Sequence, residues 1–214
     1  MREALSKTGL PRRRLNLAVF SCLILFATAA AAAPFDETRL IAAGEAQTAY
    51  TKTYDGAYTS IPYPNGDVPK ETGVCTDVVI RAYRKLGVDL QQLVHEDMKK
   101  NFSLYPKQWG LKKTDTNIDH RRVPNLQTFF TRKGKSLPAT DNGADYKPGD
   151  IVTWDLSYPK RPLPHIGIVT DKKSQDGKRY LIVHNIGRGA EVEDTLFEYH
   201  ITGHYRYEPE IQVP

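Results

Sequence analysis

The amino-acid sequence predicts an α+β fold in which a group of helices comes first and a largely antiparallel β-sheet follows. Two observations predict this order. Up to about residue 130, apolar residues recur at intervals of three and four, which is the period of a buried helix face. Beyond Gly143, short apolar and aromatic runs alternate with stretches rich in turn-forming residues, as in consecutive strands.

Four helices are expected, each with a start or stop signal. The first covers residues 36–50 and begins at an N-cap aspartate, and the second covers 75–87 and stops at Gly87. A third begins at Asp89, and a short fourth follows Pro124. The apolar residues expected to face the core are Leu40, Ala43, Ala46 and Tyr50 in the first helix, Val78, Val79, Ala82 and Leu86 in the second, Leu90, Leu93, Val94 and Met98 in the third, and Leu126, Phe129 and Phe130 in the fourth.

Four strands are expected in the second half of the chain, at residues 151–156, 166–170, 180–185 and 199–207. The dipeptide Asp176-Gly177 lies between two apolar runs and is a signal for a β-hairpin. The sheet is therefore expected to be mainly antiparallel.

The first 33 residues are predicted to be a secretory signal peptide, because three consecutive arginines precede an uncharged run that ends in alanines. The alternative is an uncleaved anchor, since the run is just long enough to cross a bilayer. Cleavage near Ala33 would leave residues 34–214 as a single domain. The expected location is periplasmic or secreted, without stable membrane association after processing.

The charge of the chain does not indicate a nucleic-acid partner. Its net charge is +5 and its pI about 9.1, but residues 1–33 hold five basic side chains and one acidic one. The mature chain is left with a charge of about +1 and no dense run of lysine or arginine, so nucleic-acid binding is not expected.

Only Cys75 remains after the predicted cleavage, so no internal disulfide can form. A lone thiol in an oxidising compartment favours a reactive role, although a buried and inert cysteine stays a second interpretation. Cys75 opens the second helix, where unpaired backbone N–H groups and a neighbouring imidazole would lower the pKa of the thiol. His165, which opens an apolar strand after a proline-rich loop, is the expected base, and His184 on the next strand is a candidate to orient it.

These motifs resemble the NlpC-type cell-wall peptidases of the papain-like clan. The pattern is a tyrosine-and-glycine loop, a cysteine that opens a helix, a Pro-Gly-Asp lead into a strand, a His-Val-Gly-Ile-like strand and a second histidine. The corresponding residues here are Tyr63-Pro64-Asn65-Gly66, Cys75, Pro148-Gly149-Asp150, His165-Ile166-Gly167-Ile168 and His184. Residues 63–185 also resemble an uncharacterised bacterial branch of that clan, a domain of unknown function.

The resemblance implies a papain-like fold, with Cys75 as nucleophile, His165 as base and His184 as orienting residue. It also implies that Tyr63 lines the site and helps to bind or stabilise the oxyanion. The neighbours of the cysteine depart from the usual Asp-Cys-Ser-Gly, because Thr76 and Asp77 follow it here. The substrate-side pocket is therefore expected to differ.

Further polar residues are candidates for substrate binding. Asp77 follows the nucleophile, and it stands four residues before Arg81, so that the two are expected to pair on the helix surface. His120 and Arg121 belong to a polar cluster that would contact a carboxylated stem peptide or simply brace a loop.

No metal and no cofactor are expected. His200 and His204 are spaced like zinc ligands on a helix, but the residues between them favour a strand or turn, and no third ligand is evident.

The favoured function is thiol-dependent hydrolysis of an amide bond, with peptidoglycan or its peptide fragments as the partner. A non-catalytic wall-binding or scaffold protein is the alternative from another class. An acyltransferase is a third interpretation, since the same thiolate can pass its acyl group to an amine. The sequence makes no prediction of the oligomeric state.

Overall fold

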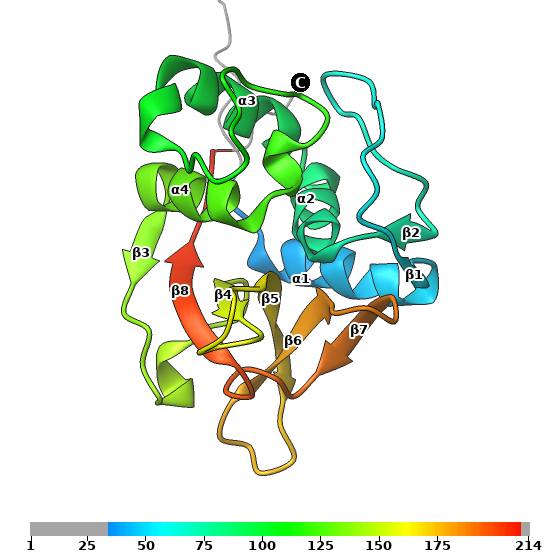
Figure 1. Ribbon diagram of the computed structural model, residues 1–214. Coiled ribbons are helices and arrows are strands. Elements are labelled where there is room, and N and C mark those ends of the chain that lie inside the picture. The colour runs from blue at the N-terminus through cyan, green and yellow to red at the C-terminus, as the bar shows by residue number, and fades with distance from the viewer. Residues whose placement is uncertain (1–33, 211–214) are drawn as a thin grey trace, which may run out of the picture. The chain divides into compact units, whose positions relative to one another are not determined.

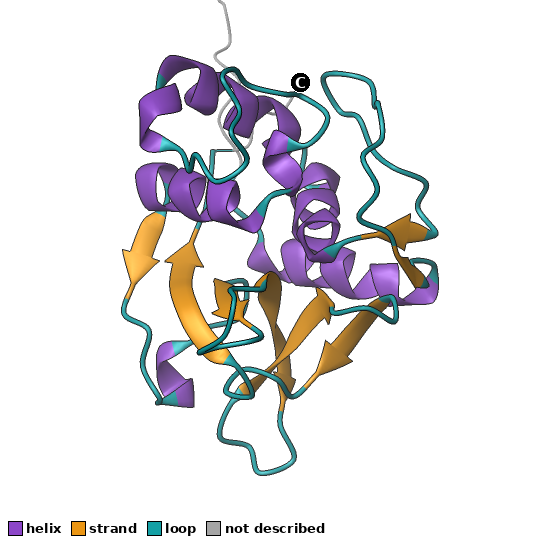
Figure 2. Ribbon diagram, viewed as in Figure 1, coloured by secondary structure: helices purple, strands orange, loops and turns teal. Residues whose placement is uncertain are grey.

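The computed structural model describes residues 34–210, so the predicted signal peptide lies outside the described residues. Helices gather on one side of a β-sheet, as Figure 1 shows, and Figure 2 separates the two kinds of element by colour. This mixed arrangement of helices and an antiparallel sheet confirms the coarse α+β prediction. Within residues 34–210, no helix has the length and apolar character needed to cross a membrane.

All four expected helices form, and the first ends in a short 3-10 turn. Their N-termini follow the cap signals of the sequence: Asp36 Oδ1 accepts a hydrogen bond from the Arg39 N–H at 3.0 Å, and Asp89 Oδ1 accepts one from the Gln91 N–H at 3.0 Å. The α-helices are α1 (Glu37–Glu45), α2 (Cys75–Lys85), α3 (Leu90–Lys100) and α4 (Val123–Lys133), and the 3-10 helices are η1 (Ala46–Ala49), η2 (Phe102–Leu104), η3 (Asp119–Arg121) and η4 (Gly143–Asp145).

Six antiparallel strands make up the main sheet, in the spatial order β3-β8-β4-β5-β6-β7. The strands are β3 (Lys135–Leu137), β4 (Ile151–Asp155), β5 (Pro164–Lys173), β6 (Tyr180–Asn185), β7 (Ala190–Glu193) and β8 (His200–Arg206). The four expected strands form the inner part of the sheet, as β8, β4, β5 and β6, whereas β3 and β7 lie at the edges and were not predicted. They escape the strand pattern because they are short and only partly buried.

The loop before α2 contains one element that the sequence did not predict. Strands β1 (Thr53–Tyr54) and β2 (Thr72–Gly73) pair in parallel and close this loop at its base. The pairing fixes the position of Tyr54 close to the start of α2.

Helix α2 is the central element of the core. Nine of its 11 residues are buried, and its apolar face packs with residues of β5 and β6 such as Ile166, Ile168 and Val183. Burial of both faces overturns one expectation: Asp77 and Arg81 do not pair with each other on a helix surface. Each is buried and binds a partner from another segment of the chain.

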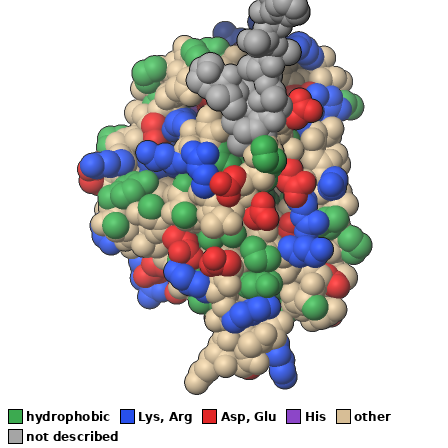
Figure 3. Space-filling model, turned by 180° about the vertical axis from the view of Figure 1, so that it is seen from behind, with side chains coloured by type: hydrophobic (Ala, Val, Ile, Leu, Met, Phe, Trp, Pro, Cys, Tyr) green, Lys and Arg blue, Asp and Glu red, His purple; other side chains and the backbone are tan. Residues whose placement is uncertain are grey.

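A smaller core, which contains Trp154, packs against the opposite face of the sheet. The Nε1–H of Trp154 donates a hydrogen bond to the Leu196 carbonyl at 3.0 Å. Just before β4, the buried Asp150 accepts hydrogen bonds from His204 Nε2 at 2.8 Å and from Arg206 Nε at 2.8 Å. The Pro-Gly-Asp turn is therefore anchored by side chains of β8. Lysine, arginine and acidic side chains are interspersed on the rear face, which Figure 3 shows.

Candidate active site

Cys75 is the first residue of α2, as the sequence predicted. The backbone N–H groups of Ile166 and Thr76 and the Tyr54 hydroxyl lie close enough to its sulfur to influence the pKa of the thiol. Ile166 is the neighbour of His165 on β5, so the start of the helix and the start of the strand meet at the sulfur. Only 4% of Cys75 is exposed.

His165 and His184 lie side by side on adjacent strands. Strand β6 pairs with β5 in a register that places His184 opposite Gly167, and His165 Nε2 lies 2.8 Å from His184 Nδ1. His184 Nε2 lies 2.9 Å from Glu193 Oε2, on the unpredicted strand β7. The result is a continuous chain from a carboxylate through two imidazoles, with Glu193 as a member that the sequence analysis missed.

The hydrogen-bond chain fixes the proton positions on both rings. A carboxylate only accepts, so His184 must carry its proton on Nε2 and leave Nδ1 as an acceptor. His165 must then donate from Nε2, which leaves the lone pair on its Nδ1. Since burial lowers the pKa of both histidines, and that of His165 to about 3, both rings are neutral at pH 7.

The thiol of Cys75 is also neutral. Burial raises its pKa to about 12, and the N–H groups of Ile166 and Thr76 and the Tyr54 hydroxyl offset only part of this. The expectation of a lowered thiol pKa is therefore wrong for the structure described here. The helix N-terminus and these neighbouring N–H and O–H groups do not compensate for the loss of water around a buried sulfur.

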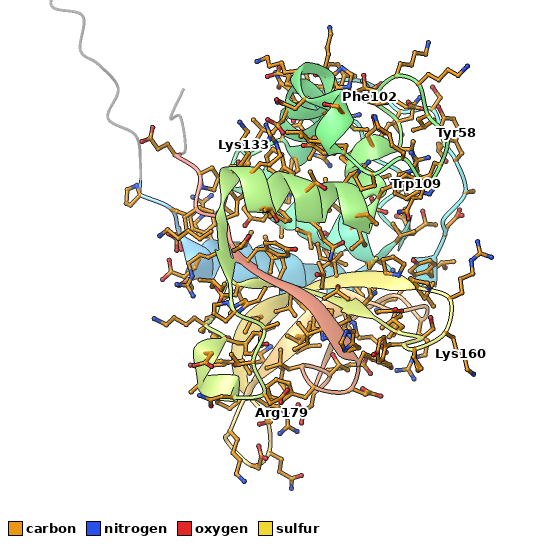
Figure 4. All side chains as sticks on the ribbon, turned by 60° about the vertical axis from the view of Figure 1, so that its left-hand side comes forward. Tyr58, Phe102, Trp109, Lys133, Lys160 and Arg179 are labelled. Carbon is orange, nitrogen blue, oxygen red and sulfur yellow. The ribbon has the colours of Figure 1, made fainter. Side chains whose placement is uncertain are left out.

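A cavity of about 220 Å³ opens beside Cys75. Pro164, the residue before His165, belongs to its wall, and so does Trp109 from the loop after α3. Figure 4 shows Trp109 and Tyr58 on the same side of the molecule, with Lys160 of the loop before β5 below them. The cavity wall also contains Tyr54, Arg121, Arg122 and Pro124.

Tyr63 does not lie at this site. Its ring stands edge-on to His95, with 5.1 Å between ring centres, and it is not part of the cavity wall. Tyr54 occupies the position next to the sulfur that was expected of Tyr63. The segment Tyr54-Asp55-Gly56 carries the same tyrosine-and-glycine signature, so the sequence contained the signal, but periodicity could not decide between the two tyrosines.

Asp77 is not free to bind a substrate. It is 3% exposed, and its carboxylate accepts hydrogen bonds from Arg121 Nε at 3.0 Å, Arg121 Nη2 at 2.9 Å and the Val74 N–H at 2.7 Å. The Arg121 carbonyl in turn accepts from the Thr76 hydroxyl at 3.1 Å. This pair therefore ties η3 to the first turn of α2 and holds Cys75 in place, while Arg121 also borders the cavity.

His120 is buried and is not part of the cavity wall. Its Nδ1 has no hydrogen-bond partner within the described residues, and burial lowers its pKa to about 3. Its position therefore matches the interpretation that it braces a loop.

The buried histidines make stability depend on pH. Between its ordinary pKa of about 6.5 and its folded value, His120 binds a proton in the unfolded state but not in the folded state. The free energy of unfolding should therefore fall as the pH decreases through this window, by about 1.4 kcal/mol per pH unit for each such group. Asp119 acts in the opposite direction, because burial raises its pKa to about 6.

Urea unfolding of wild type and His120→Gln between pH 7 and 4 measures this contribution. The variant should lose stability less steeply on acidification, whatever its stability at pH 7. Parallel curves for wild type and His120→Gln would contradict the assignment.

His200 and His204 do not form a metal site. His204 bonds to Asp150 and to the Pro138 carbonyl, whereas the His200 ring stacks on Tyr158 with 4.1 Å between ring centres. In the part of the chain that the structure describes, no group of three or more potential metal ligands comes together.

Fold and site together define a mixed helix–sheet protein with a buried cysteine at the start of a helix and a hydrogen-bonded pair of histidines on the sheet. The chain belongs to the family described as Domain of unknown function (DUF1287), whose model matches residues 41–207. A relative in Escherichia coli (strain K12), the uncharacterized protein YijF, is 56% identical over 161 residues, which cover 75% of this chain and 77% of the relative.

Two crystal structures of an N-acetylmuramoyl-L-alanine amidase from Bacteroides uniformis ATCC 8492 are also similar. They are 13% identical in sequence, with TM-scores of 0.49 and 0.48, and the match covers 81% of this chain and 99% of theirs. At this level of similarity, the function has to be derived from the geometry of the site.

Proposed function

We propose that this protein is an exported thiol hydrolase that cleaves an amide bond, with peptidoglycan stem peptides as its substrate. Cys75 is the nucleophile, His165 is the base, and His184 with Glu193 holds the base in the required tautomer. The observation that carries the proposal is the hydrogen-bond chain from Glu193 to His165, because it leaves a lone pair on Nδ1 of His165, whose strand neighbour Ile166 lies beside the Cys75 sulfur.

A neutral thiol and a neutral imidazole can carry out this reaction without a preformed ion pair. As the Cys75 sulfur attacks the amide carbonyl, its proton moves to Nδ1 of His165, and the new imidazolium is stabilised through His184 by the Glu193 carboxylate. His165 then protonates the leaving amine, which gives a thioester on Cys75. Water, activated by the same histidine, hydrolyses the thioester and restores the thiol.

Hydrogen-bond donors beside the sulfur can stabilise the negative charge that develops on the carbonyl oxygen. The Tyr54 hydroxyl and the backbone N–H of Thr76 already reach the sulfur, and the start of α2 supplies the positive end of a helix dipole. Tyr54 thus takes the role that the resemblance assigned to Tyr63.

Peptidoglycan is proposed as substrate on two grounds. The predicted signal peptide would place the protein on the side of the inner membrane where peptidoglycan lies. The motifs around Cys75, His165 and His184 resemble those of cell-wall peptidases, which act on peptide bonds of the wall.

Purified sacculi test the proposal. The wild-type protein should release peptide-containing fragments that mass spectrometry detects, Cys75→Ala should release none above background, and His200→Ala should match wild type as a histidine replacement outside the site. Identical fragment profiles for wild type and Cys75→Ala would refute the hydrolase.

One observation favours a second candidate, a wall-binding protein without turnover. Cys75 is almost completely buried and its thiol pKa is raised, as expected for a packing residue. The alkylation rate of Cys75 separates the two candidates, because His165→Gln should slow alkylation near pH 8 if His165 accepts the thiol proton. An inert cysteine would react at the same rate in both proteins.

A further inference from the structure

The cavity beside Cys75 has a positive wall. Arg121 and Arg122 both border it, and none of the residues that line it carries a carboxylate. Its volume of about 220 Å³ is below the roughly 300–1,000 Å³ of sites for drug-sized ligands, so it suits a single amino-acid residue rather than a longer ligand.

The guanidinium of Arg122 is held in place but is not saturated with hydrogen bonds. Its Cζ lies 4.2 Å from the centre of the Trp109 ring, a cation–π contact that restrains the guanidinium over the ring. Its ion-pair partner, Asp119 Oδ1, is 3.7 Å from Nη1, which is longer than a hydrogen bond. Neither this Nη1 nor Asp119 Oδ1 has a hydrogen-bond partner within the described residues.

Arg121 also keeps one donor group unused. Its side chain is 2% exposed, and its Nε and Nη2 are occupied by Asp77. Its Nη1 has no partner in the part of the chain that the structure describes. An unpaired buried donor is costly, and a ligand oxygen would remove that cost.

We propose that this cavity binds a carboxylate of the substrate, so that the enzyme selects an amide bond next to an acidic amino-acid residue. Arg122, oriented by Trp109, provides the main contact, since a planar guanidinium matches a carboxylate with two parallel hydrogen bonds. The claim that the ligand is a substrate rests on the proposed hydrolase function. The carboxylate preference of the cavity does not depend on that function.

Two alkylating reagents that differ in charge test the preference without any turnover. Iodoacetate carries a carboxylate, whereas iodoacetamide is neutral. The alkylation rate of Cys75 with iodoacetate is divided by its rate with iodoacetamide, and this ratio is normalised to the same ratio for N-acetylcysteine. A normalised ratio above 1 reports attraction of an anion into the cavity. We expect a normalised ratio of at least about 10 for wild type, which falls towards 1 in Arg122→Gln.

Arg179→Gln is the matched control, because Arg179 lies in the β5–β6 hairpin, far from Trp109 in Figure 4. It should keep the wild-type ratio. Arg122→Lys should keep part of the preference, because lysine retains the charge without the planar fork. An unchanged ratio in Arg122→Gln would overturn the proposal.

Direct binding provides a second measurement, which tests the carboxylate preference even if neither reagent alkylates Cys75. Calorimetry with Cys75→Ala should show the C-terminal amide of N-acetyl-alanyl-glutamate bound at least about 10-fold more tightly than the C-terminal amide of N-acetyl-alanyl-glutamine, with the difference lost when Arg122→Gln is added. Equal affinities, or no binding of either peptide, would overturn the proposal. If the carboxylate preference holds while sacculi stay intact, the hydrolase fails and the carboxylate site remains.

Discussion

Replacement of His165 by glutamine is expected to slow fragment release from sacculi by about 10²–10⁴-fold, the usual contribution of a general base. The variant should remain folded, because glutamine is uncharged like the buried neutral imidazole. Initial rates of fragment release, with circular dichroism as a check on folding, measure the effect. A rate within a factor of two of wild type would remove His165 from the mechanism.

Glu193→Gln examines the proton arrangement itself. A glutamine can donate to His184 Nε2, which would reverse the donors along the chain and place a proton on Nδ1 of His165. The rate should fall by at least about 10-fold although no atom next to the sulfur has changed. His200→Gln, which alters a histidine outside the chain of hydrogen bonds, should leave the rate unchanged.

Replacement of Arg121 by methionine is expected to lower the free energy of unfolding by about 3–5 kcal/mol, since it leaves the Asp77 carboxylate buried without its partner. For a chain of this size, that corresponds to a fall in Tm of roughly 10 °C. Urea denaturation at pH 7 measures it.

The double variant Asp77→Asn with Arg121→Met should recover part of the loss, because no uncompensated charge then remains. Losses that simply add would show that the two side chains do not interact. Arg179→Gln, which breaks a more exposed ion pair with Asp194, serves as the control and should cost at most about 1 kcal/mol.

Local sequence patterns were sufficient for most of the elements. The three- and four-residue spacing of apolar residues located α1 to α4, and the apolar runs located β4, β5, β6 and β8. The edge strands β3 and β7 have too few buried positions to stand out from loops. β3 forms by pairing with β8, which is distant in sequence, and β7 forms by pairing with β6, the strand directly before it.

In the candidate site, too, some residues could be predicted from local patterns and others could not. Cys75, His165 and His184 each stand at a recognisable local position, the start of a helix or a residue within an apolar strand. Glu193 and Tyr54 could not be assigned, because their roles depend on the β6–β7 register and on the β1–β2 pairing.

By itself, the sequence determined which residue types were available and where helices and strands begin, since these depend on short-range periodicity and capping. Only the tertiary structure decided that Tyr54 rather than Tyr63 touches the sulfur, that Asp77 binds Arg121 rather than Arg81, and that the thiol is neutral. Burial and the distances between segments far apart in the chain set these properties, and neither is encoded in any local pattern.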